Sequence, residues 1–341
     1  MTERRFYHVL IRAAFLVVTA GSVFALFARQ YWVAELFTHF RLYYLLIQAL
    51  LALIFLHYGH RWLLLSTLAF ALPNAWVVGP YLTPVIGGRS AAADAGAGIE
   101  LVALNVNYRN DGYARVADYL RDCDPDVIVI TEFTPAWQTQ LGFLRESHPY
   151  WLGKARPDPW GLAVFSRLPF EEAELISLAK TDAVQARLVF SLGATKLEVF
   201  AVHLFSPTSP ARAHHRNLQL DALANRVRAS EYQAMVVGDM NLTPFSPYFS
   251  RFVTRSGLRD AGLADGYYVT WPMSMLPVWI PIDHALFDPR INTVRSRAGS
   301  DIGSDHLPLE VVVREETGKR QGRDEKGVQK AAGINPSGKA P

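Results

Sequence analysis

The sequence predicts a layered α/β domain preceded by an apolar segment that spans a membrane. Half of the 341 residues are hydrophobic, but the apolar residues are concentrated in the first eighty or so positions. From residue 99 onward, short apolar runs of strand type alternate with helical patterns. Such alternation is typical of an α/β domain built in layers. We therefore expect a membrane part followed by a separate folded domain.

Three apolar stretches fit helices that cross a bilayer: residues 9–28, 42–57 and 62–78. Between positions 9 and 82 only five side chains are charged: Arg12, Arg29, Glu35, Arg41 and Arg61. About 20 helical residues cross the roughly 30 Å hydrocarbon core, so the second stretch is slightly short. A cleaved signal peptide would explain only the first stretch. Three transmembrane helices are therefore expected.

The distribution of basic residues predicts the orientation of these helices. Arg4 and Arg5 precede the first stretch, and His57, His60 and Arg61 lie between the second and third. The positive-inside rule places both groups in the cytoplasm. Because the number of spans is odd, the rest of the chain then lies outside. We expect a multi-pass protein of the cell membrane with an extracytoplasmic α/β domain, in contact with the lipid bilayer.

Composition divides the chain into four parts. We expect a membrane segment at 1–86, a flexible linker rich in Gly, Ala and Ser at 87–98, the α/β domain at 99–313 and a disordered polar tail at 314–341. The α/β domain carries twenty Lys and Arg against twenty-four Asp and Glu, although the whole chain has a formal charge of +3. Nonspecific nucleic-acid binders are normally basic, so this acidic balance makes DNA a less favoured partner.

The expected strands are marked by short apolar runs. They begin at Leu101, Asp126, Gly161, Ala186, Leu197, Ala234 and Leu307. Helices are expected over 113–122, 136–146 and 211–229. Cys123 is the only cysteine, which excludes an intramolecular disulfide and a cysteine metal cluster.

Polar side chains gather at or just after the ends of these strands. They are Asn105, Glu132, His203, Asp239, Asn241, Asp283, Asp305 and His306. Each has an ordinary structural explanation: Asp239 and Asn241 as turn formers, Glu132 as a helix cap and His203 as a satisfied buried histidine.

Taken together, these residues match the needs of one reaction. Hydrolysis of a phosphate ester requires oxygen ligands for a hard cation, a group that orients water and donors for the phosphate oxygens. Glu132 and Asn105 offer the oxygen ligands, and Asp239 with His306 offers a pair that can handle water. The donors are then expected from Asn241 and His203.

A series of short motifs, in a fixed order along the chain, resembles a known family. The motifs are LNVN from Leu104, DVIVITE ending at Glu132, GLAVFSR, VHL with His203, GDMN with Asp239, PIDHALF with Asp283 and GSDHLPL with His306. This series resembles the endonuclease/exonuclease/phosphatase superfamily, which includes DNase I-like nucleases, sphingomyelinases and inositol phosphatases. The three-span plan is similar to that of its membrane-anchored bacterial members. The resemblance covers 99–313 and implies a two-sheet α/β sandwich with the site at one end of the sheets.

The resemblance also implies a metal side of the site. Glu132 resembles the principal magnesium ligand of the family, and Asn105 a neighbouring ligand. Asp305 would be a second carboxylate on the metal side. We therefore expect Mg²⁺, or Mn²⁺ in its place, as the cofactor.

The remaining motif positions imply roles on the substrate side. Asp239 would orient or deprotonate the attacking water, and Asn241 would hold the scissile phosphate. His306 would pair with Asp283 and act on the phosphate and nucleophile. His203 matches the histidine that stabilises the pentacovalent state.

Two further features bear on the substrate. Arg187 is a candidate for binding a substrate phosphate, with a surface arginine at a sheet edge as the alternative. The loop 271–281 is apolar and aromatic, so it either packs on the core or meets lipid. No long basic insertion of the kind that grips DNA is evident.

The sequence thus favours a metal-dependent hydrolase of a phosphoester or pyrophosphate bond, acting on a lipid-linked phosphate. One alternative is an extracytoplasmic DNase I-like nuclease, and another is a catalytically inactive membrane-binding module. The sequence does not determine the oligomeric state.

Overall fold

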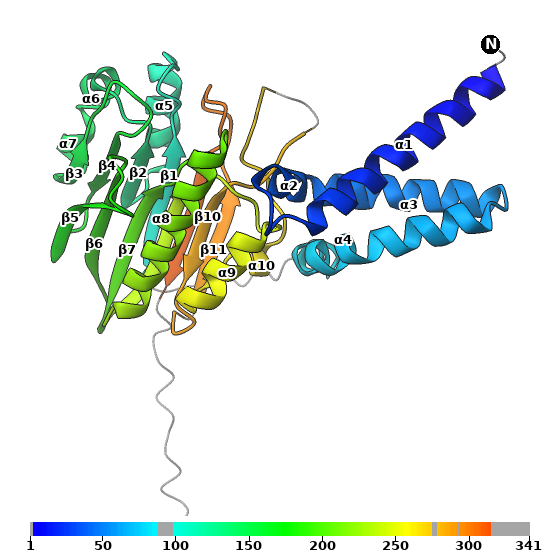
Figure 1. Cartoon of the computed structure of the whole chain (residues 1–341). Helices are drawn as coiled ribbons and strands as arrows, with labels where there is room; N and C mark the ends of the chain where they lie inside the picture. Colours follow the sequence, from blue (N-terminus) through cyan, green and yellow to red (C-terminus); the bar gives the residue numbers. More distant parts are fainter. Residues whose placement is uncertain (1–2, 88–97, 275–277, 292, 315–341) are drawn as a thin grey trace, which may run out of the picture.

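The computed structural model describes residues 3–87, 98–274, 278–291 and 293–314. Long helices project from one side of a layered α/β body (Figure 1). The predicted linker at 87–98 and tail at 314–341 lie outside the described residues, except that Gly87 ends a helix, Gly98 begins a strand and Arg314 ends one.

The N-terminal part is helical throughout most of its described length. It consists of α1 (Glu3–Leu26), α2 (Trp32–Leu36), the 3₁₀ helix η1 (Phe37–Phe40), α3 (Arg41–His57) and α4 (Arg61–Gly87). Three segments are long and apolar enough to cross a membrane: Tyr7–Leu26, Trp32–His57 and Arg61–Pro84. This agrees with the three spans expected from the sequence.

The second and third segments extend beyond the predicted stretches. The second covers 26 residues, because α2 and η1 continue directly into α3. Its first part, α2 and η1, lies at the end of the bundle nearest the α/β domain, and α3 supplies most of the apolar length (Figure 1). The third continues past residue 78 although α4 contains three prolines, Pro73, Pro80 and Pro84. Proline is tolerated within transmembrane helices because neighbouring groups can satisfy the freed backbone carbonyls.

A buried polar network connects the three long helices. Asn74 of α4 donates to Ser22 Oγ of α1 at 2.9 Å and to Gln48 Oε1 of α3 at 3.1 Å. Arg41 donates to Asn74 Oδ1 at 2.9 Å. All four side chains are buried. Hydrogen bonds between helices in an apolar environment favour one mutual arrangement, so this network helps to specify the packing of the bundle.

The α/β domain contains two six-stranded sheets. The first has the order β11 (Thr293–Ala298), β12 (Leu309–Arg314), β1 (Gly98–Asn105), β2 (Val127–Thr131), β4 (Leu162–Ser166) and β3 (Tyr150–Lys154). The second has the order β5 (Glu172–Ser177), β6 (Val184–Leu192), β7 (Thr195–His203), β8 (Gln233–Asp239), β10 (Asp283–Phe287) and β9 (Arg259–Asp260). Each sheet has one parallel pair, β1 with β2 and β7 with β8, among antiparallel neighbours.

Helices cover the outer face of each sheet. On the first sheet lie α5 (Tyr113–Cys123), α6 (Pro135–Gln140) and α7 (Leu144–Ser147); on the second lie α8 (Pro210–Ala229) and α9 (Pro247–Ser256), and α10 (Gly262–Asp265) follows β9. The largest apolar cluster fills the space between the sheets. The prediction of a two-sheet α/β sandwich is therefore confirmed.

Some elements differ from those expected. The predicted helix 136–146 is divided by a turn at Leu141–Phe143, which contains Gly142, a poor helix former. Strands β3, β5, β9, β10 and β11 were not predicted. Most side chains of the edge strands β3 and β5 are exposed, and their sequences lack a continuous apolar run. Strand β10 is buried, but it is short and begins with the polar residues Asp283 and His284.

Candidate active site

Strand alternation brings the polar residues to one end of the inter-sheet core. In β1, Leu101 and Ala103 belong to this core, and Asn105 is the next residue on the same face. In β7, Val199 and Ala201 are followed in the same way by His203. Because side chains point to the same face of a strand at every second position, each strand delivers its last inward residue to the end of the core.

Register then aligns three residues of the second sheet. His203 at the end of β7 pairs with Asp239 at the end of β8, and Asp239 pairs with Asp283 at the start of β10. The His203 Nε2 atom lies 3.5 Å from Asp239 Oδ2. All three side chains are buried. The sheet itself thus fixes this part of the site.

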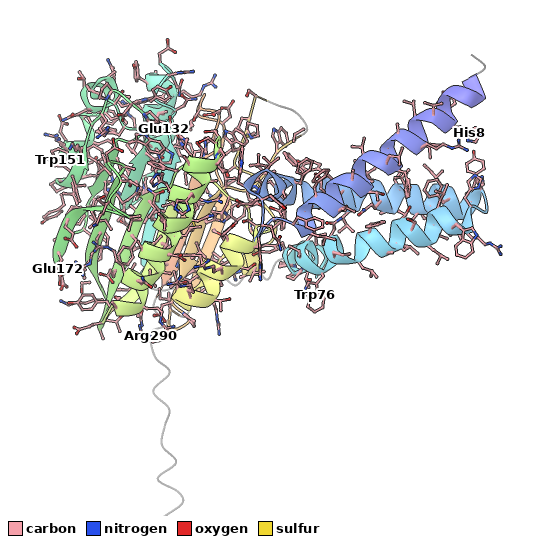
Figure 2. The ribbon with its side chains drawn as sticks, viewed as in Figure 1. His8, Trp76, Glu132, Trp151, Glu172 and Arg290 are labelled. Atoms are coloured by element: carbon pink, nitrogen blue, oxygen red, sulfur yellow. The ribbon has the colours of Figure 1, made fainter. Side chains whose placement is uncertain are left out.

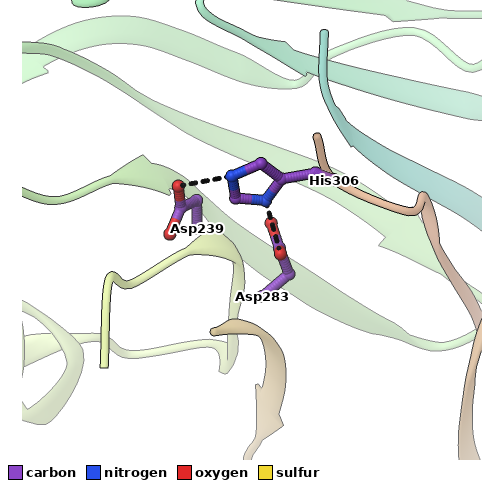
Figure 3. A group of neighbouring side chains, drawn as sticks. All are labelled: Asp239, Asp283 and His306. Atoms are coloured by element: carbon purple, nitrogen blue, oxygen red, sulfur yellow. Dashed lines mark hydrogen bonds and ion pairs between the residues drawn. The ribbon is translucent and has the colours of Figure 1, made fainter. Parts of the chain in front are cut away.

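His306 completes a buried Asp–His–Asp group, shown in Figure 3. Its Nδ1 donates to Asp283 Oδ2 at 2.9 Å, and its Nε2 lies 3.8 Å from Asp239 Oδ2. Burial opposes the charged ring, but the negative charge of Asp283 and its hydrogen bond dominate and raise the pKa of His306 to about 10. The same pairing outweighs burial for Asp283 and holds the pKa of its carboxyl below the usual value. An imidazolium beside a carboxylate is the expected state at neutral pH.

Asp239 occupies an unfavourable electrostatic position for a carboxylate. Burial, and then the charge of Asp283, raise the pKa of the Asp239 carboxyl to about 8. Its Oδ1 accepts the backbone N–H of Asn241 at 2.8 Å, and its Oδ2 accepts from Asn105 Nδ2 at 3.1 Å. The turn that the sequence suggested for GDMN is therefore present, and the carboxylate also faces the site.

Glu132 and Asn105 form the other side of the site. Asn105 Nδ2 donates to Glu132 Oε1 at 3.2 Å, and the Tyr108 N–H donates to Glu132 Oε2 at 2.8 Å. Glu132 does not cap the following helix, because Thr134 is the N-cap of α6 and accepts from the Trp137 N–H. Glu132 has a positive φ of 58°. Such strain in a non-glycine residue is often found at functional sites.

Asp305 is held in place by two residues that the sequence analysis did not assign. Its Oδ1 accepts from Asn107 Nδ2 at 2.9 Å, and its Oδ2 accepts from Trp271 Nε1 at 3.0 Å. The Asn107 N–H in turn donates to Asn105 Oδ1 at 3.0 Å. Asn107 is the last residue of the LNVN motif, so the motif contained a signal for it, whereas Trp271 is distant in sequence and gave none.

The two donor candidates have partners of their own. His203 Nδ1 donates to the Pro159 carbonyl at 3.1 Å, which leaves Nε2 facing the carboxylates. Burial lowers the pKa of His203 despite the opposing effect of Glu132. The Asn241 side chain donates to the Leu204 carbonyl at 2.9 Å, and one of its two amide hydrogens remains for a ligand.

Arg187 is not brought to the site. It lies on β6 between inward-facing Ala186 and Leu188, so its side chain points to the outer face of the sheet. There it forms ion pairs with Glu172 and Glu198. The alternative of a sheet-surface arginine therefore describes it better, and the proposed role in phosphate binding is not supported.

The donor set fits a divalent cation. Asn105 Nδ2 joins the carboxylates of Glu132 and Asp239, and burial together with the charge of Asp283 raises the pKa of Asp239, an effect that a bound cation would oppose. Ligand atoms of Asp239, Asp283 and His306 all lie within 4.8 Å of one another. Because His306 Nδ1 is already committed to Asp283, a hard cation would take the carboxylate oxygens of Glu132 and Asp239. Asn105 directs its amide nitrogen to both of these carboxylates, and its Oδ1 accepts from the Asn107 N–H. The structure therefore gives Asn105 a positioning role and does not present it as the oxygen ligand expected from the sequence.

A two-sheet sandwich with carboxylates, amides and histidines at one end of the core has the architecture of the DNase I-like proteins. Residues 102–306 match the model of the Endonuclease/Exonuclease/phosphatase family, and the chain belongs to this family. No curated protein sequence matches the chain significantly.

Solved structures agree with this assignment. A truncated TDP2 from Caenorhabditis elegans is 17% identical with a TM-score of 0.54, over 64% of this chain and 98% of the other. A mutant β-toxin from Staphylococcus aureus with bound magnesium ions is 16% identical with a TM-score of 0.52, over 64% and 100%. Sphingomyelinase C from Streptomyces griseocarneus is 18% identical with a TM-score of 0.50, over 64% and 100%. At these identities the likeness establishes the fold.

Proposed function

We propose that the protein is a membrane-anchored, Mg²⁺-dependent hydrolase of a phosphoester or pyrophosphate bond in a lipid-linked substrate. Members of the family are hydrolases that act on phosphoester bonds. The complete set of carboxylates, amides and histidines at the end of the core supports the same activity here and argues against an inactive binding module.

Each side chain has a chemical task in this proposal. Glu132 would hold the cation, which would supply charge neutralisation at the phosphate. Asn105 positions the Glu132 carboxylate, and Asp305 holds Asn107, whose N–H in turn fixes Asn105. Asp239 would be ionised when a cation opposes the effects that raise its pKa, and it would then orient the attacking water and accept its proton. The imidazolium of His306, fixed by Asp283, stabilises charge on the phosphate oxygens.

His203 and Asn241 are assigned to the equatorial phosphate oxygens. Asn241 can donate its second amide hydrogen. His203 becomes a donor through Nε2 when its ring is protonated, because its Nδ1 is held by the Pro159 carbonyl. The negative charge of a bound phosphate favours that protonated form.

We choose a lipid substrate because the candidate active site is in contact with the membrane helices. The loop 271–281 begins at the site, where Trp271 donates to Asp305 and its ring centroid lies 6.4 Å from that of His306. Near its other end, the Trp279 carbonyl accepts from Tyr43 of α3 at 2.6 Å. The described parts of this loop, 271–274 and 278–281, therefore contact the candidate active site and the membrane segment respectively, as expected for a substrate presented at the bilayer surface.

The test compares substrates for the full-length protein in mixed micelles. We expect a higher kcat/KM for a polyprenyl pyrophosphate or a phospholipid than for plasmid DNA at matched Mg²⁺, and loss of all turnover in the Asp239→Asn variant. Release of phosphate or headgroup is measured for the lipids and nicking for the plasmid. Efficient plasmid cleavage with neither lipid hydrolysed would support the nuclease alternative instead.

A further inference from the structure

The loop that follows Asp239 is held by the membrane segment. This loop, residues 241–246, leads from the end of β8 to the start of α9. Facing it is Glu35 of α2, whose carboxylate accepts from Arg216 of α8 at 2.5 Å. Both side chains are completely buried, with 0% exposed surface. An ion pair between the membrane segment and the α/β domain therefore lies beside the loop.

The loop is also contacted at its middle and its end. The second oxygen of Glu35 accepts from Ser246 Oγ at 2.8 Å. His39 of η1 accepts from Thr243 Oγ1 through its Nδ1 at 3.0 Å. Phe245 packs against Val78 and Tyr81 of α4. The membrane segment thus contacts Thr243, Phe245 and Ser246 of the loop directly.

A continuous series of hydrogen bonds links Glu35 to Asp239. Arg216 Nη2 donates to Glu35, and its Nη1 donates to the Asn241 carbonyl at 3.3 Å. The Asn241 N–H then donates to Asp239 Oδ1 at 2.8 Å. Asn241 has a positive φ of 53°, a conformation that its surroundings must maintain. One guanidinium therefore joins the membrane segment to the residue that holds Asp239.

The energetics of the Glu35–Arg216 ion pair favour a role in positioning the loop over a role in simply docking the membrane segment on the α/β domain. A buried ion pair contributes little net stability, because desolvation offsets much of the attraction, but it requires one geometry when every polar atom is satisfied. Here both Glu35 oxygens have partners, and Arg216 also donates through Nε to Asn217 and lies over the Tyr248 ring. The apolar contacts of Phe245 and Tyr81 provide docking without this geometric demand.

We propose that Glu35 and Arg216 are positioning residues for catalysis, so that the membrane segment forms part of the support of the active site. This inference rests on the proposed function, because it assigns the loop a role in turnover. In this arrangement, Arg216 fixes the backbone of Asn241, and Asn241 fixes the carboxylate of Asp239. Loss of the ion pair releases the loop without removing any group that touches substrate.

The test uses the full-length protein in micelles with a soluble p-nitrophenyl phosphodiester. Glu35→Gln removes the negative charge of the ion pair. Arg216→Lys keeps a positive charge for Glu35 but loses the second donor, which bonds to the Asn241 carbonyl. The matched control is Asp221→Asn, which removes the partly exposed ion pairs of the same helix α8 with Arg251 and Arg255. Hydrogen exchange of the amides at 241–246 is measured on every variant.

We expect kcat to fall about 10- to 100-fold in both test variants, as for a small misplacement of a reacting group, with KM changed less than about twofold. Faster exchange at 241–246 should accompany the fall, and Asp221→Asn should match the wild type. Wild-type kcat and unchanged exchange in Glu35→Gln and Arg216→Lys would overturn the inference, as would faster exchange with wild-type kcat. A wild type without phosphodiesterase activity would refute the proposed function, while the exchange data would still show whether Glu35 holds the loop.

Discussion

Glu132 and Asn241 share an unusual backbone conformation, and both lie at the candidate site. A left-handed conformation at a non-glycine residue costs on the order of 1–3 kcal/mol, so surrounding contacts must compensate for it. Glu132 is held by the Tyr108 N–H and Asn105, and Asn241 by Asp239 and Leu204. The positions of these two side chains are therefore determined by local hydrogen bonds as well as by the sheets.

Glu132 should control the affinity for Mg²⁺. Glu132→Gln keeps the size of the side chain but removes its negative charge, and hard cations depend on ligand charge. We expect the dissociation constant for Mg²⁺ to rise at least about tenfold, measured by calorimetry and by the Mg²⁺ dependence of turnover. Glu146→Gln, at an exposed position, is the control. Identical Mg²⁺ affinity in Glu132→Gln and wild type would remove Glu132 from the metal site.

His306 should control the rate of turnover. His306→Gln preserves a donor for Asp283 but can neither carry positive charge nor transfer a proton. We expect kcat to fall about 10²- to 10⁴-fold in a protein that still folds, with a lower thermal unfolding temperature because the buried Asp283 loses its cationic partner. His214→Gln changes an exposed histidine of α8 and should have no effect. A folded His306→Gln protein with wild-type kcat would show that the Asp–His–Asp group is structural.

At the level of elements, the sequence predicted most of the central strands and the strand ends that carry the site. Buried strands such as β2 are continuous apolar runs, and the ends of β2 and β8 are marked by Glu132 and Asp239. The edge strand β5 and the central strand β10 were missed, and the division between α6 and α7 was not predicted, because the local sequences give weak or mixed patterns. Trp271 could not have been assigned, because its contact with Asp305 depends on a tertiary arrangement of loops. For Arg187 the sequence did contain the answer. Because side chains alternate along a strand, its apolar neighbours in β6 indicate that Arg187 points to the outer face of the sheet, away from the site.

Close packing of β7 against β8 next to the site depends on Gly238. A Cβ at Gly238 would lie 2.3 Å from the Val202 carbonyl oxygen, and its φ is +125°. Gly238→Ala should therefore destabilise the protein by about 3 kcal/mol, from strain and overlap combined. Gly257 has a φ of +79°, but a Cβ there would enter open space, so Gly257→Ala should cost only about 1 kcal/mol. Chemical or thermal unfolding of both variants gives the comparison, and equal losses would mean that overlap with Val202 is unimportant.

At the scale of the whole molecule, the helix bundle has two chemically different ends. Figure 2 shows His8 far from the α/β domain and Trp76 near it. The turn between α3 and α4, with His60 and Arg61, lies at the far end with the start of α1. Trp76 is 84% exposed, as expected for an aromatic side chain at a membrane interface. The basic groups used to predict orientation therefore share one end, and the α/β domain occupies the other.

This arrangement predicts an extracytoplasmic active site. Basic residues are retained in the cytoplasm, so the far end should face inward and the α/β domain outward. Alkaline phosphatase folds to an active form only outside the cytoplasm; we therefore expect activity when it is fused after Gly98 and none when it is fused after His60. A reporter that works only in the cytoplasm should give the reverse pattern at the same two positions. If the fusion after Gly98 were inactive and the one after His60 active, the α/β domain would lie in the cytoplasm. Its lipid substrate would then have to be in the inner leaflet of the membrane, not in the outer leaflet.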